Sequence, residues 1–151
     1  MTRLWVTLKR LLIDRPKKLA QLVKRFAIQP CQCPIGHGIR CLEDNVLVEK
    51  LRSLQTPLEV SPQSNYCLGV LPRSQPHPIR QMLDAELYCT LNSDDPPMFS
   101  TNLTHEYLTL ATQGFDWKEL WQLNLNTLEA TFLSEAEKAE YRTRFNDWYK
   151  A

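Results

Sequence analysis

Glycine is scarce in this chain, and long apolar runs are missing altogether. Only four of the 151 residues are glycine, and none belongs to the glycine-rich loop with which nucleotide kinases hold phosphate groups. Residues 4–28 are too short and too charged to span a bilayer, and they lack the apolar core and cleavage site of a secretory signal. Internal repeats and low-complexity tracts are absent too, so we expect one globular domain of ordinary size.

Disulfide frameworks and paired zinc-binding cysteines are also missing. The chain has five cysteines, Cys31, Cys33, Cys41, Cys67 and Cys89. Their number is odd, and their spacing fits neither a secreted disulfide framework nor a pair of C-x₂-C zinc sites. We therefore expect free thiols in a reducing compartment and a cytoplasmic location.

Charge is distributed unevenly, although the whole chain carries a formal net charge of +1. Residues 1–30 hold eight basic residues and one acidic residue, which gives +7, while the remainder holds ten basic and sixteen acidic residues, which gives −6. Apolar residues recur every three or four positions over residues 4–28, which predicts a basic helical stretch interrupted at Pro16. We expect it to pack on the protein itself, because binding to nucleic acid or to a membrane would rest on charge alone.

Three short strand-like runs end in polar side chains at nearly equal intervals. The first ends at His37, the second at Asn65 and the third at Asp94, which are 28 and 29 positions apart. That interval holds one strand, one helix and two loops, as in a parallel sheet or a (β/α)₈ barrel. Chemistry in such barrels gathers at the carboxyl ends of the strands, so we expect these side chains to line one rim. A full barrel takes about 250 residues, so the chain is either a smaller fold or part of a barrel.

Helix signals follow the strands and dominate the C-terminal half. Apolar spacing predicts helices over residues 45–55, from 77 onward, over 102–112, over 116–132 and from 134 to about 148. The helix over 116–132 has so many apolar positions that we expect it to be buried on most sides. We interpret His77 as a helix-start residue rather than a ligand, and His105 as a surface or capping residue rather than a catalytic one.

Two adjacent carboxylates, Asp94 and Asp95, follow the third run and precede Pro96. If both are ionised they repel each other, and burial of either is costly unless a cation or a hydrogen-bond donor compensates it. The simplest compensation is a metal held by one acid while the other binds a polar ligand. The alternative is a solvated Asp-Asp-Pro turn.

Four motifs resemble the C-terminal part of the adenosine deaminase family in both order and spacing. They read IGHGIR at residues 35–40, LEVSPQSN at 58–65, HP at 77–78 and TLNSDDPPMF at 90–99. The stretch FSTNLTHEY at residues 99–107 resembles adenosine deaminases more than the related adenine-specific enzymes. The fold class implied is α/β: about three βα units of a TIM-type (β/α)₈ barrel plus C-terminal helices. This adenosine deaminase-like portion would cover residues 34–151, preceded by a basic helical segment, 1–33, that the family does not match.

The resemblance implies zinc-dependent hydrolytic deamination of adenosine or deoxyadenosine. In that family a Zn²⁺ ion lowers the pKa of a bound water toward about 7, and the hydroxide attacks C6 of the purine. Carried over to this chain, Asp94 is the carboxylate ligand of the zinc, and Asp95 accepts a hydrogen bond from purine N7. His37 orients or stabilises the attacking hydroxide.

Motifs that would complete such a site do not occur in the sequence. The family takes further zinc ligands from a His-x-His pair and another histidine, and a proton-donating glutamate from a His-Ala-Gly-Glu motif, and none of these is present. The His-x-Glu and Cys-x-x-Cys signature of cytidine-type deaminases is absent too. Because catalytic zinc sites take three protein ligands, we expect the chain alone to be inactive without a missing N-terminal half or another chain. Two alternatives stay open: a non-catalytic remnant that serves as an interaction module, and a relative of the adenine-specific enzymes.

Smaller departures from the family pattern concern single residues. Pro34 stands where an arginine is usual, Ser61 where a cysteine is common, and Glu86 where a glycine is usual. If that glycine position has a positive φ, Glu86 adds backbone strain.

Overall fold

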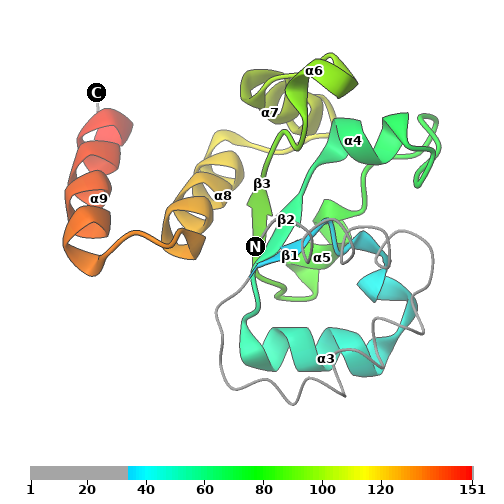
Figure 1. The fold of residues 1–151 in the computed structure, drawn as a ribbon, viewed down its shortest axis with the longest axis horizontal. Helices are drawn as coiled ribbons and strands as arrows, with labels where there is room; N and C mark the ends of the chain where they lie inside the picture. The colour runs from blue at the N-terminus through cyan, green and yellow to red at the C-terminus, as the bar shows by residue number, and fades with distance from the viewer. Residues whose placement is uncertain (1–33, 151) are drawn as a thin grey trace.

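A small parallel sheet lies at the centre of the computed structural model, which describes residues 34–150 (Figure 1). The strands are β1 (Ile35–Gly36), β2 (Leu58–Val60) and β3 (Cys89–Leu91), and they lie in that order in the sheet. All pairs are parallel, with Ile35 opposite Leu58 and Leu58 opposite Cys89. Each connection therefore crosses over through a helix, as parallel strands require.

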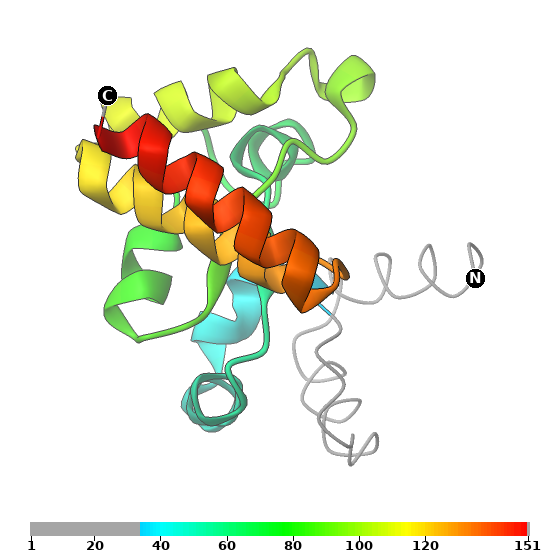
Figure 2. The same ribbon diagram turned by 90° about the vertical axis from the view of Figure 1, so that its left-hand side faces the viewer.

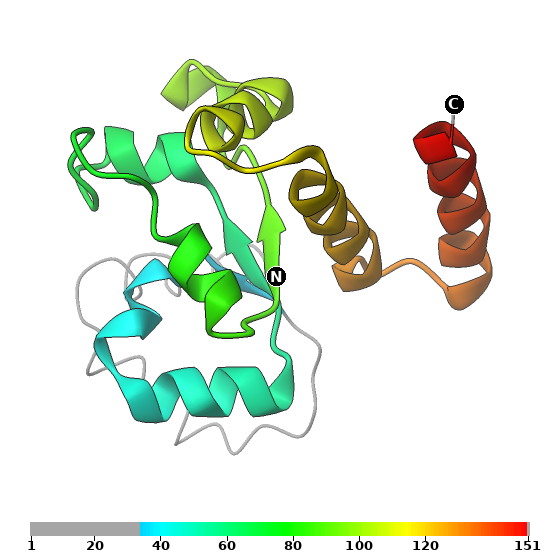
Figure 3. The same ribbon diagram turned by 180° about the vertical axis from the view of Figure 1, so that it is seen from behind.

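Helices cover one face of the sheet and extend beyond its last strand. They are the 3₁₀ helix η1 (Ile39–Glu43), α3 (Asn45–Leu54), α4 (Pro62–Cys67), α5 (Ile79–Asp84), α6 (Pro96–Phe99), α7 (Leu103–Thr112), α8 (Trp117–Ala130) and α9 (Glu135–Lys150). Figure 3 shows α3 and α5 on one side of β3 and α8 on the other. The short helices α4 and α6 follow β2 and β3 within a few residues, so they gather with α7 at the carboxyl ends of these strands (Figure 1).

The two faces of the sheet differ in chemistry. Residues opposite each other share a face, so Leu58, Val60 and Leu91 lie on one face while Glu59 and Thr90 lie on the other. The first face is buried in the core that the helices cover. Core residues contributed by the helices and loops around it include Ile79, Met82, Leu110, Phe115, Leu120 and Leu123. The second face carries small and polar side chains.

Side-chain caps confirm several predicted helix starts. Asp44 accepts hydrogen bonds from two backbone N–H groups in the first turn of α3, at 2.9 and 3.2 Å. At α8, Asp116 and Glu119 form a capping box. Ser134 and Glu137 pair in the same manner at α9, where the hydroxyl donates to the carboxylate at 2.6 Å. A cap of this type contributes about 1 kcal/mol to helix stability.

The strand-like run that was predicted to end at Asn65 is wrong beyond Val60. The strand ends there, and the next residues form α4 with Pro62 in its first turn. Proline suits this position because its fixed φ is already helical and its missing N–H leaves no intrahelical bond unmade. Ser64 and Asn65 therefore stand on a helix that begins at the rim, not on a strand.

The prediction that residues 116–132 are buried on most sides is also wrong. Leu120, Leu123 and Leu128 are buried, but Trp117 is 61% exposed and Phe132, beyond the end of the helix, is 83% exposed. Another part of the apolar surface of α8 packs against α9, which runs beside it (Figure 2).

An aromatic cluster joins α8 to α9. The ring of Trp121 lies 5.7 Å from that of Trp117, 5.8 Å from that of Phe145 and 5.2 Å from that of Tyr149. Aromatic pairs at these separations add stabilisation beyond the area that they bury. The cluster is thus a main attachment of α9 to the rest of the fold.

A buried carboxylate ties α7 to the start of α4. Glu106 has no exposed surface, and it accepts hydrogen bonds from the backbone N–H of Gln63 at 3.0 Å and from the hydroxyl of Thr101 at 2.7 Å. Burial raises the pKa of the Glu106 carboxyl, although both hydrogen bonds oppose that rise. The contact fixes the helix that carries Ser64 and Asn65.

The structure also bears on three smaller predictions. Glu86 has a φ of 58°, so the strain expected at this position is confirmed. Cys41, Cys67 and Cys89 are free thiols. Burial raises the pKa of Cys41 to about 11 and that of Cys89 to about 12.

No helix within residues 34–150 has the length and apolar character needed to cross a membrane. The predictions for the basic segment 1–33, including Cys31 and Cys33, lie outside the described residues.

Candidate active site

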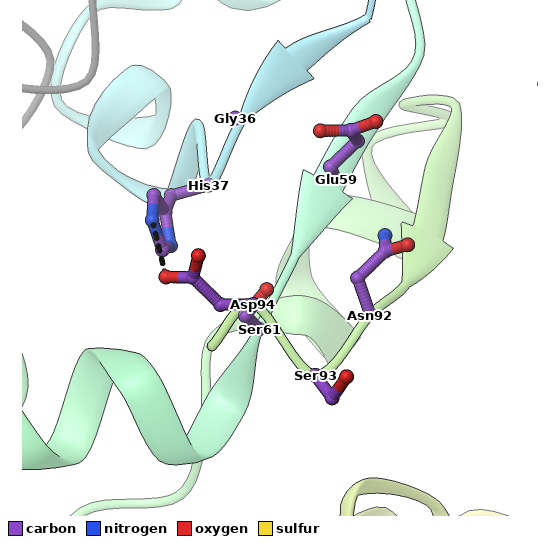
Figure 4. A pocket seen from close by; sticks show the side chains of 7 residues that line it. All are labelled: Gly36, His37, Glu59, Ser61, Asn92, Ser93 and Asp94. Carbon is purple, nitrogen blue, oxygen red and sulfur yellow. Dashed lines mark ion pairs between the residues drawn. The ribbon is translucent and has the colours of Figure 1, made fainter. Parts of the chain in front are cut away.

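The polar face of the sheet opens into a pocket at the carboxyl ends of the strands (Figure 4). Its volume is about 250 Å³. The residues that line it are Gly36, His37, Glu59, Ser61, Asn92, Ser93 and Asp94. Each of them belongs to a strand or follows one within a few residues, so three successive strand ends build the pocket together.

His37 comes directly after β1. Its backbone N–H donates to the carbonyl of Glu59 at 2.9 Å, which extends the pairing of β1 with β2 by one residue. The backbone then turns through left-handed conformations, with φ 62° at His37 and 69° at Gly38. A Cβ atom at position 38 would lie only 3.0 Å from Cδ2 of Leu58, so glycine is needed there. The turn leaves the imidazole buried and directed toward Asp94 (Figure 4).

Asp94 follows β3 and also has a left-handed backbone, with φ 57°. Its Oδ2 atom lies 3.4 Å from Nε2 of His37 and accepts a hydrogen bond from the hydroxyl of Ser64 at 2.8 Å. Its side chain is 12% exposed. The structure therefore brings two of the three predicted site residues together, and Ser64 holds the carboxylate in place.

Asp95 points elsewhere. Its carboxylate accepts the backbone N–H of Met98 at 3.3 Å and caps the first turn of α6. The residue is exposed and is not among those that line the pocket. Its predicted contact with purine N7 stays a prediction.

Glu59, Asn92 and Ser93 are among the pocket residues that sequence reasoning did not predict. Glu59 alternates with the buried Leu58 and Val60, and this alternation is the signal that could have placed it on the polar face. Asn92 and Ser93 carry no such pattern, because they lie beyond the end of β3, where the strand period no longer applies.

Behind the pocket, Asn65 contacts His37 from the interior, and His77 in turn contacts Asn65. Nδ2 of Asn65 lies 3.0 Å from Nδ1 of His37, and Oδ1 of the same amide lies 2.9 Å from Nε2 of His77. The exposed fractions of His37, Asn65 and His77 are 6%, 1% and 2%. Burial, aided by the nearby His37, lowers the pKa of His77 to about 4, so its ring is neutral at pH 7.

The structure confirms the helix-start interpretation of His77 and adds to it. Its Nδ1 accepts the backbone N–H of Ile79, the first residue of α5, at 3.2 Å. The same ring also contacts the site through Asn65, which the sequence did not indicate. His105 is an exposed residue in the first turn of α7, as expected, and its backbone N–H is capped by Asn102.

A metal site can be tested against these donors. Within residues 34–150, no group of three or more histidine, cysteine, aspartate or glutamate side chains is arranged to hold a metal ion. Asp94 offers a hard anionic oxygen, which suits zinc, but a catalytic zinc centre takes three protein ligands. The described residues therefore do not fit a complete zinc centre.

Comparison with known proteins gives consistent matches. A family model described as adenosine deaminase matches residues 20–148 and so begins within the basic segment. An adenine deaminase from Rhizobium rhizogenes is 44% identical over 111 residues, which are 73% of this chain and 34% of that protein. The crystal structure of an adenine deaminase from Arthrobacter aurescens aligns with a TM-score of 0.83 at 30% identity, covering 93% of this chain and 42% of that one.

A more distant structure shares the fold. An amidohydrolase from Burkholderia ambifaria, solved with bound Zn, aligns with a TM-score of 0.76 at 21% identity and covers 91% of this chain and 38% of that one. These neighbours confirm the predicted fold class, an α/β structure that forms part of a TIM-type barrel. The chain spans about a third of the length of the curated relatives it matches.

Proposed function

Because the chain belongs to the adenosine deaminase family, we propose that it forms one side of the active site of a purine deaminase. The proposed reaction is hydrolytic. Water replaces the exocyclic amino group at C6 of the purine, and ammonia leaves. His37 and Asp94 are the groups that this chain contributes from two of its strand ends.

The meeting of these two side chains is the observation that carries the proposal. Nε2 of His37 and Oδ2 of Asp94 lie 3.4 Å apart in a polar pocket, and both side chains are largely withdrawn from solvent. An imidazole N–H stabilises a developing oxyanion, and a fixed carboxylate binds a cation or accepts a proton from the reacting group. Both interactions strengthen where water is excluded.

We propose adenine as the substrate in preference to adenosine. The Rhizobium and Arthrobacter proteins both carry the name adenine deaminase, and the chain is 44% and 30% identical to them. The adenosine preference predicted from residues 99–107 is not confirmed by these matches. The adenine-specific alternative is therefore the better supported of the two.

Zinc is the proposed metal, with Asp94 as one of its ligands. The other histidines of the chain are already placed elsewhere, since His77 is used in buried hydrogen bonds and His105 is exposed on α7. The remaining ligands must then come from outside residues 34–150. We propose that turnover requires further βα units of the barrel, supplied by the same polypeptide or by a partner chain.

Complementation tests this function directly. The purified chain is assayed with zinc and with adenine, adenosine or deoxyadenosine, following the absorbance change of the purine. The assay is repeated after mixing with the remaining barrel units of the Rhizobium rhizogenes protein, made as a separate segment. We expect no turnover by the chain alone and turnover of adenine by the mixture.

Two substitutions test whether turnover in the mixture depends on the carboxylate of Asp94. Asp94→Asn should abolish turnover in the mixture, while Asp84→Asn, the same change at an exposed aspartate, should leave it intact. Full activity of Asp94→Asn would contradict the role of this carboxylate. A complex that forms but converts none of the three purines would refute the proposed function.

A further inference from the structure

An unbroken chain of hydrogen bonds runs from the start of α5 to the pocket. The backbone N–H of Ile79 contacts Nδ1 of His77 at 3.2 Å, and Nε2 of His77 contacts Oδ1 of Asn65 at 2.9 Å. Nδ2 of Asn65 then contacts Nδ1 of His37 at 3.0 Å, and Nε2 of His37 lies 3.4 Å from Oδ2 of Asp94. Three different elements are joined in this way: α5, α4 and the turn after β1.

The direction of every bond follows from its first donor. A backbone N–H can only donate, so Nδ1 of His77 must be the acceptor and a neutral ring then carries its proton on Nε2. That proton goes to Oδ1 of Asn65, which leaves the amide nitrogen of Asn65 to face His37. An amide nitrogen only donates, so Nδ1 of His37 accepts and its ring proton stands on Nε2.

Burial makes the direction of these hydrogen bonds hard to reverse. Asn65 and His77 are 1% and 2% exposed, so water cannot readily replace either partner. Within the described residues, no buried side-chain nitrogen or oxygen lacks a hydrogen-bond partner. The ring of Tyr66 packs edge-on against His77 with the centroids 6.0 Å apart. Turning the Asn65 amide over would set its nitrogen against the Nε2–H of His77 and its oxygen against the acceptor of His37, at the cost of two buried hydrogen bonds.

We propose that Asn65 and His77 are positioning residues that fix His37 as the tautomer protonated on Nε2, the nitrogen that faces Asp94 and the pocket. The assignment of the tautomer rests on hydrogen-bond geometry alone, while its catalytic meaning rests on the proposed deaminase function. In this form His37 presents a hydrogen-bond donor to the pocket. Nε2 can then donate a hydrogen bond to an oxygen of the reacting group. It cannot bind a metal, because a protonated Nε2 has no lone pair to offer.

Nitrogen NMR determines the tautomer of His37 and does not require the chain to be catalytically active. The chain is labelled with ¹⁵N-histidine, and long-range proton–nitrogen correlations at pH 7 report which ring nitrogen is protonated. The sequence has only three histidines, and His105→Gln removes the exposed one to assist assignment. We expect Nε2 protonated and Nδ1 unprotonated in both His37 and His77. A proton on Nδ1 of His37 in the unsubstituted chain would overturn the proposal.

Two variants separate positioning from a merely structural role. Asn65→Asp replaces the donating amide nitrogen by an acceptor of the same shape, so Nδ1 of His37 should gain a proton and its resonance should move to the protonated range. His77→Gln keeps a donor toward Asn65, so the signals of His37 should stay in place. An unprotonated Nδ1 in folded Asn65→Asp, or a change of tautomer in His77→Gln, would refute the mechanism. Because no activity is measured, these outcomes do not depend on whether the chain supports deamination.

Discussion

Acidification from pH 7 to pH 4 should destabilise the folded chain through His77. His77 is 2% exposed, and burial lowers its pKa from 6.5 to about 4. The unfolded chain therefore binds a proton at this residue more readily than the folded chain throughout that range. One pKa unit corresponds to about 1.4 kcal/mol, so the free energy of unfolding should fall by about 3 kcal/mol between pH 7 and pH 4.

The sign of the effect follows from the lowered pKa. The stability associated with a neutral His77 is fully present above pH 6.5 and is lost progressively as the pH falls toward 4. The carboxyl of Glu106 acts in the opposite direction, because its raised pKa favours the folded state at lower pH. The change in the free energy of unfolding of the unsubstituted chain would therefore combine the contributions of His77 and Glu106.

Urea unfolding of two proteins isolates the contribution of His77 to the pH dependence of stability. The free energy of unfolding is measured at intervals from pH 7 to pH 4 for the unsubstituted chain and for His77→Gln, which cannot titrate but can still donate to Asn65. The difference between the two proteins should change by about 3 kcal/mol across this range in favour of the glutamine variant. Curves that stay parallel within about 1 kcal/mol, less than one pKa unit, would show that His77 is not held neutral by the fold.

Three further substitutions test other parts of the structure. Glu106→Leu should lower the free energy of unfolding in urea at pH 7 by about 1–3 kcal/mol, since the buried backbone N–H of Gln63 then has no acceptor, and an unchanged midpoint would contradict the role of Glu106 in holding α4. Gly38→Ala should lower the melting temperature, at a cost of about 1–2 kcal/mol, because position 38 has a left-handed backbone and its Cβ would crowd Leu58. Trp121→Ala should speed proteolysis within α9 without affecting the sheet, as followed by mass spectrometry; equal rates would show that the aromatic cluster does not anchor this helix.

Local patterns in the sequence predicted much of the fold. Equal spacing of polar strand ends placed His37 and Asp94 at one rim, because parallel strands end at the same edge of a sheet. Helix starts at Asp44, Asp116 and Ser134 were predictable because each cap is a contact between residues two or three positions apart. Such contacts depend on little beyond the local chain.

The remaining features depend on contacts that sequence patterns do not encode. Pro62 is compatible both with the end of a strand and with the first turn of a helix, so the start of α4 was missed. The exposure of Trp117 depends on which surfaces pack against α8. The bonds from Asn65 to His37 and His77 join residues 28 and 12 positions apart, and only the folded backbone brings them within reach.

The left-handed backbone at His37 and Asp94 affects how these two positions should be mutated. Replacing either residue by alanine removes a functional group and also leaves a side chain in a conformation that glycine, asparagine and aspartate tolerate better. A loss of activity in an alanine variant would then combine missing chemistry with a shifted turn. Asparagine at position 94 and asparagine or glycine at position 37 delete the chemical group while sparing the backbone, so these are the substitutions whose kinetic effects can be assigned to the side chains themselves.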